Sequence, residues 1–123
     1  MTNLARQLEM NVETWGRLRQ HGVTKATSLR LDFMYEAPTR GAADKLIQLL
    51  RGETDYDVSE PLASGAASPR SFFVSGTTQD AKVSLDVLNQ WVDWMVAAGH
   101  QSGGCVFDGW GAQVPASEPE RAG

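Results

Sequence analysis

Apolar residues recur at helical spacing in three parts of the chain, residues 3–21, 38–51 and 83–99. Steps of three and four residues place these side chains on one face, so each segment predicts an amphipathic helix. Glycines mark the expected C-terminal ends at Gly22, Gly52 and Gly99. The expected buried faces are Leu4, Leu8, Val12, Trp15 and Leu18; Ala42, Ala43, Leu46, Ile47 and Leu50; and Val87, Leu88, Trp91, Val92, Trp94, Met95 and Ala98.

Alternation of period two predicts a strand over residues 29–35, where Leu29, Leu31, Phe33 and Tyr35 alternate with Arg30, Asp32 and Met34. Shorter apolar runs predict further strands at 55–60, 70–77 and 105–107. Residues 61–69 are small and bracketed by prolines, which is typical of a loop, and a turn is expected at Gly76 and residues 77–80.

After the first helix the predicted order is therefore β-α-β-β-α-β, which is the ferredoxin-like arrangement. We expect an α+β sandwich with a four-stranded antiparallel sheet, two helices on one face and an extra N-terminal helix. Residues 1–23 would form that amphipathic helix, 24–114 the ferredoxin-like domain and 115–123 a disordered tail. The extra helix could cover a sheet edge, cover the second sheet face or pack across a homodimer.

The composition of the chain limits the number of domains, the compartment and the class of partner. A chain of 123 residues fits one domain, and a single cysteine, Cys105, excludes an internal disulfide. The start lacks a signal-peptide core and no apolar run is long enough to span a membrane, so we expect a cytoplasmic protein without membrane contact. The net charge of −4 repels phosphate backbones on average, so direct nucleic-acid binding is not expected.

Catalytic and metal-binding signals are weak. His21 and His100 stand at predicted helix C-termini, where the helix dipole favours them, and Cys105 falls in a predicted strand, where inert thiols are common. The sequence contains no nucleophile elbow, no zinc or calcium motif and no phosphate loop. We therefore predict a non-enzymatic protein with no metal and no cofactor.

The predicted topology also occurs in RNA-recognition domains, whose third strand presents stacking aromatics on the open sheet face. Residues 70–77 match that pattern at Arg70 and Phe72 but carry Val74 and Thr77 where aromatics belong. A single-stranded RNA binder stays an alternative, as does a small-molecule or enzyme-associated module that uses the open sheet face.

The most informative segment is Phe107-Asp108-Gly109-Trp110-Gly111, an aromatic between two glycines after a short apolar strand. It resembles the terminal signature of the regulators of ribonuclease activity B, the ribonuclease E inhibitor family (RraB), and residues 29–35 support the resemblance, which covers about residues 28–114. The resemblance implies a regulatory protein that binds a ribonuclease and modulates RNA turnover. We expect Asp108, Gly109, Trp110 and Gly111 to contact the protein partner, with Trp110 folded over the end of the sheet as a lid.

Overall fold

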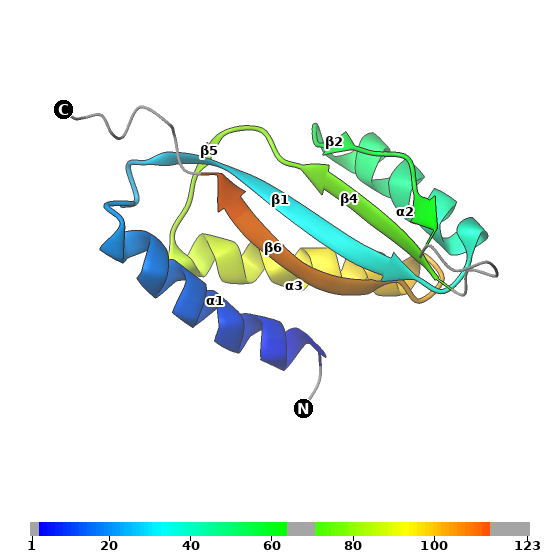
Figure 1. Cartoon of the computed structure of the whole chain (residues 1–123), viewed down its shortest axis with the longest axis horizontal. Helices are drawn as coiled ribbons and strands as arrows, with labels where there is room; N and C mark the ends of the chain where they lie inside the picture. Colours follow the sequence, from blue (N-terminus) through cyan, green and yellow to red (C-terminus); the bar gives the residue numbers. More distant parts are fainter. Residues whose placement is uncertain (1–2, 64–70, 114–123) are drawn as a thin grey trace.

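The fold was analysed in a computed structural model that describes residues 3–63 and 71–113. Within these residues, three helices and six strands form an α+β structure in which all strand pairs are antiparallel (Figure 1). The elements in chain order are α1 (Asn3–Gln20), β1 (Ser28–Ala37), α2 (Arg40–Glu53), β2 (Asp57–Val58), β3 (Leu62–Ala63), β4 (Phe72–Thr77), β5 (Ala81–Lys82), α3 (Leu85–Gln101) and β6 (Val106–Gln113).

Strand β1 lies at the centre of the sheet. It pairs with β4 along one side and with β6 along the other, and its first two residues pair with β5. The short strands β2 and β3 both pair with β4. The expected count of four strands is thus wrong, because two short strands, β3 and β5, form outside the ranges in which strands were expected.

Helices cover only one face of the sheet. In Figure 1, α3 and α2 lie behind the strands, and the near face carries no helix. Alternate residues of β1 point to the covered face, which buries Leu29, Leu31, Phe33, Tyr35 and Ala37. The expected buried face of α2 is confirmed in full, since the five residues expected on it are all buried.

Helix α1 packs against α3 and β6, beside the sheet edge that β6 forms (Figure 1). Of the three positions considered for it, the structure therefore shows the edge. The expected apolar face is wrong at one position, because Val12 is 56 % exposed. The buried residues of α1 are Trp15, as expected, and the polar residues Gln7 and Asn11, while Leu4, Leu8 and Leu18 pack partly against the core.

Several expected boundaries also change. Gly22 ends α1 with φ of +92°, as predicted, but α2 and α3 continue past Gly52 and Gly99. Gly76 lies inside β4 rather than in a turn, and Cys105 lies just before β6. The predicted loop 61–69 contains β3 at its start, and its remainder lies outside the described residues, as does the predicted tail 115–123.

None of the helices in the described ranges combines the length and the apolar character that crossing a membrane requires.

Candidate functional site

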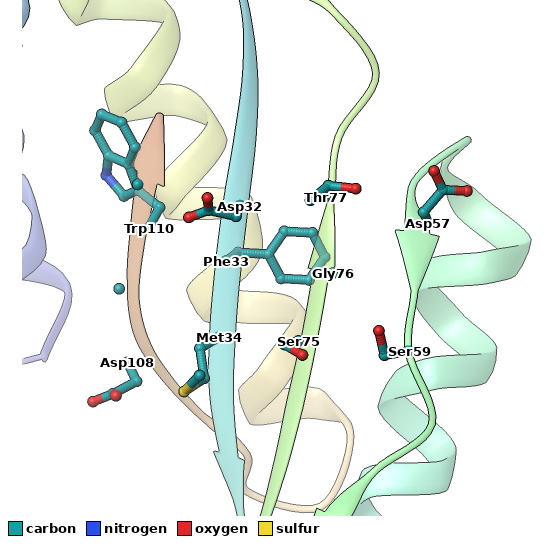
Figure 2. A pocket seen from close by; sticks show the side chains of 12 residues that line it. Asp32, Phe33, Met34, Asp57, Ser59, Ser75, Gly76, Thr77, Asp108 and Trp110 are labelled. Carbon is teal, nitrogen blue, oxygen red and sulfur yellow. The ribbon is translucent and has the colours of Figure 1, made fainter. Parts of the chain in front are cut away.

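The uncovered face of the sheet holds a hollow. Its volume is about 560 Å³ and it is open to solvent (Figure 2). All four residues singled out by the sequence, Asp108, Gly109, Trp110 and Gly111, line it. The other lining residues come from three strands and the segment after β2: Asp32, Phe33, Met34, Asp57, Ser59, Ser75, Gly76 and Thr77.

Strand register explains which side chains share this face. Directly opposed residues of antiparallel strands point to the same side of a sheet. Asp32 lies opposite Thr77 on β4 and Gly111 on β6, and Asp57 on β2 also lies opposite Thr77. This row therefore places two carboxylates on the open face, with Thr77 between them and Gly111 beside Asp32.

The next row is more apolar. Met34 lies opposite Ser75 on β4 and Gly109 on β6, and its side chain is 41 % exposed. One step further along β1, the register places Phe73, Leu62 and Val106 around Glu36. Leu62 and Val106 are 67 % and 49 % exposed. The open face thus has an acidic part and an adjoining apolar part.

The hollow exists because the strands beneath it carry few large side chains. A Cβ atom on Gly111 would lie 2.7 Å from Asp32 Oδ1, so glycine leaves the room into which that carboxylate turns. Figure 2 shows the Asp32 side chain directed towards β6. Ser59, Ser75 and Thr77 add only small polar groups, which keeps the floor close to the backbone.

A β-bulge in β6 decides how the sequence motif is oriented. Met34 pairs with Gly109 but Tyr35 pairs with Phe107, so Asp108 is the extra residue. Gly109 adopts φ of +146°, a conformation that other residues rarely reach. The expectation that the strand ends at this motif is therefore wrong, because β6 continues to Gln113.

The bulge also sends the Trp110 ring to the helix side of the sheet. Trp110 lies opposite Phe33, whose side chain is buried on that side. Its ring meets Trp91 edge-on at 6.1 Å between centroids, and its Nε1 donates a hydrogen bond of 2.7 Å to Asn11 Oδ1. Figure 2 shows the indole turned away from the strands. Trp110 therefore joins β6 to α1 and α3. Its neighbours in β6, Gly109 and Gly111, line the hollow of the open face.

The polar groups that bind α1 complete this junction. Phe107 O accepts hydrogen bonds from Asn3 Nδ2 at 3.1 Å and from Gln7 Nε2 at 3.4 Å. Asn11 Nδ2 donates to Asn89 Oδ1 at 3.0 Å. Side-chain amides thus occupy a sheet edge that a further strand would otherwise pair with. Sequence reasoning missed these residues because polar side chains in a helix normally indicate the solvent side.

The open face of the sheet is acidic. Asp32, Asp57 and Asp108 line the hollow, and no ion pair joins any of them to a cation within the described ranges. Across residues 3–63 and 71–113, no three histidine, cysteine or acidic side chains gather closely enough to hold a metal ion. The carboxylates therefore create a negative potential that attracts cations, and they do not form a set of metal ligands.

The remaining candidate groups lie elsewhere. His21 Nδ1 lies 2.8 Å from Arg17 O just after α1, and His100 is in the last turn of α3, as their helix-end positions predict. Burial raises the pKa of the Cys105 thiol, which lies 3.5 Å from Ala42 O. The structure brings none of these three to the hollow.

Models of known protein families do not match this chain, and no curated protein matches it. The resemblance to the ribonuclease E inhibitors therefore stays a prediction from the residues themselves.

Proposed function

We propose that this protein is a non-catalytic regulatory domain that binds a protein partner through the open face of its sheet. The observation that carries the proposal is the combination on that face of three carboxylates with exposed Met34, Leu62 and Val106. Methionine and aromatic residues are enriched where proteins bind each other, and charges around them steer the encounter. The resemblance of the 107–111 motif suggests a ribonuclease of the E type as that partner.

The charge of the face supports a ribonuclease partner on general grounds. An enzyme that holds RNA presents lysine and arginine to the phosphate backbone. A surface carrying Asp32, Asp57 and Asp108 complements such basic groups and would compete with RNA for them. Inhibition would then result from occupation of the basic surface, and it would require no chemistry from this chain.

The same carboxylates disfavour the alternative of a single-stranded RNA binder. They would repel the phosphates of RNA, and base stacking needs aromatic side chains on the open face. By strand register Phe73 points to this side, whereas Phe33, Tyr35 and Phe107 are buried on the other. One half-buried ring next to Glu36 is a poor stacking platform.

We further propose that the sheet is of the ferredoxin-like kind, in a cytoplasmic protein. Support comes from the chain order, in which β1 and β4 are central neighbours, α2 and α3 follow β1 and β5, and β6 completes the sheet. In this assignment β2 with β3, and β4 with β5, each represent one interrupted strand.

The proposal is tested by titrating the whole chain into purified ribonuclease E from the same cells and measuring heat of binding at low and high salt. Replacing the three carboxylates together (Asp32→Asn, Asp57→Asn and Asp108→Asn) is expected to weaken binding roughly tenfold, since each exposed ion pair contributes about 0.2–1 kcal/mol. The salt dependence of the affinity should fall with it.

A matched control removes the same number of charges from helices α1 and α3, at the exposed residues Glu9, Glu13 and Asp93. We expect this control to bind like the parent chain. Absence of ribonuclease binding by the parent chain contradicts the proposal. Equal weakening by both triple variants would show that net charge, and not the open face, governs association.

A further inference from the structure

A second, more enclosed cavity lies on the helix side of the sheet, away from the open face. Its volume is about 260 Å³. It is bounded by β1, by the segment from β4 to β5, by residues 55–56 and by α3. The residues that line it are Leu31, Asp55, Tyr56, Thr78, Gln79, Asp80, Ala81, Val83, Val87, Leu88 and Trp91.

An interruption of strand pairing creates this space. Pairing of β1 with β4 stops at Thr77 and resumes with β5 at Ala81. Across the gap, Leu31 O accepts from Thr78 N at 2.8 Å, and Thr78 Oγ1 accepts from Leu31 N at 3.0 Å. A side chain thus replaces a backbone group in the ladder, so the backbone at 78–80 departs from the sheet without leaving Leu31 unsatisfied.

The walls of the cavity are apolar and firmly held. Leu31, Val83 and Leu88 are at most 5 % exposed, and Trp91 supplies an aromatic wall. Trp91 also meets Phe33, Phe107 and Trp110 edge-on, which fixes its ring in place. A preformed wall of this kind favours a compact apolar group, because little side-chain freedom is lost when it enters.

The mouth is polar and acidic. Asp55 and Asp80 both line it and both are exposed. Arg30 lies 3.5 Å from Asp80 in a solvent-exposed ion pair, which offsets part of the charge of Asp80. Asp55 has no such partner in the described part of the chain, and no lysine or arginine lines the cavity. A cationic group on a ligand would therefore meet carboxylates at the opening.

Tyr56 also lines the cavity, and it carries a hydroxyl group. It accepts a hydrogen bond of 3.0 Å from Trp91 Nε1, and the described residues offer no acceptor for its own proton. Burial raises the pKa of Tyr56, while the bond from Trp91 lowers it and the nearby Asp55 raises it further. The hydroxyl is therefore neutral at physiological pH and can donate to a ligand.

We propose that this cavity binds a small molecule with an apolar body the size of one ring and a cationic amine that lies between Asp55 and Asp80. The size follows from the volume, which is below the range of about 300–1,000 Å³ that holds drug-sized ligands. The inference does not rest on the proposed protein-binding function, since it concerns other residues on the other side of the sheet.

The test compares three probes of nearly equal size: 2-phenylethylamine, neutral 2-phenylethanol and anionic 3-phenylpropionate. Each is titrated into the whole ¹⁵N-labelled chain by NMR. We expect saturable shifts of the Trp91 indole N–H and of the Thr78 and Gln79 amides, with affinity falling from amine to alcohol to carboxylate. No saturable shift at these signals with any probe overturns the proposal, and so do shifts centred on Met34 and Asp108.

Two variants locate the site. Val87 is 46 % exposed at the mouth, so Val87→Phe should fill the opening without loss of stability and weaken amine binding about tenfold or more. Asp55→Asn should weaken amine binding by about twofold to fivefold and leave alcohol binding unchanged. Asp93→Asn, an exposed charge elsewhere on α3, is the matched control. If Val87→Phe binds the amine like the parent chain, or the two Asn variants behave alike, the assignment is wrong.

Discussion

The hydrogen bond between Trp110 and Asn11 joins the sequence motif to α1, and breaking it should destabilise the whole fold. Asn11 is fully buried, and an indole can only donate, so Asn11 Oδ1 is the acceptor and its Nδ2 is left to donate to Asn89. Trp110→Phe keeps an aromatic ring beside Trp91 but removes the donor. The Asn11 carbonyl then stays buried without its partner.

A buried acceptor that loses its partner costs about 1–3 kcal/mol. We take about 2 kcal/mol for Trp110→Phe, which for a chain of this length lowers Tm by about 6–12 °C. Trp110→Ala also loses the ring contact with Trp91, so the cost should rise to about 3–5 kcal/mol.

Urea unfolding of the parent chain, Trp110→Phe, Asn11→Leu and the double variant gives the coupling energy. We expect about 1–2 kcal/mol, because removing both partners is less costly than the sum of the single losses. Trp94→Phe is the control, since Trp94 is 40 % exposed and should cost less than about 0.5 kcal/mol. A coupling energy within error of zero would refute the assigned role of this bond.

Three further outcomes follow from single groups. Gly109→Ala should lower the free energy of unfolding in urea by about 1–3 kcal/mol, because φ is +146° at this residue. Gly16 lies in α1 with open space around it, so Gly16→Ala should raise the free energy of unfolding by up to about 1 kcal/mol. Equal effects of the two substitutions would argue against the bulge. Burial raises the pKa of Tyr35 far above its usual value and, less strongly, that of Tyr56, so the stability they contribute is complete below about pH 10 and is lost as pH rises beyond it. Tyr35→Phe should flatten that alkaline decline in a series of Tm values, and an unchanged slope would exclude Tyr35 as its source. The Cys105 thiol is 3 % exposed and should react with a thiol reagent only as fast as the chain opens, so reaction at the rate of a free thiol in the folded protein would contradict its burial.

Local sequence patterns were sufficient to predict the elements that bury a single apolar face. The strand around Leu29–Tyr35 and all five buried residues of α2 follow from periodicity alone, because each element buries a single apolar face. Residues 108–111, which the sequence singled out as candidate partner contacts, line the hollow on the open face, and their contact with a partner stays a prediction. The geometry of this segment was not predicted, because a bulge depends on the register of β1 against β6 and not on the residues of β6 alone.

Helix α1 shows most clearly what the sequence alone did not predict. Its apolar residues determine that it is amphipathic. Val12 was expected on the buried face but is exposed, and the neighbouring Asn11 is buried. Only the tertiary structure brings Trp110 and Asn89 to that amide from 99 and 78 residues away. Burial of a polar side chain is favourable only where distant partners complete its hydrogen bonds, so the choice belongs to the assembled fold.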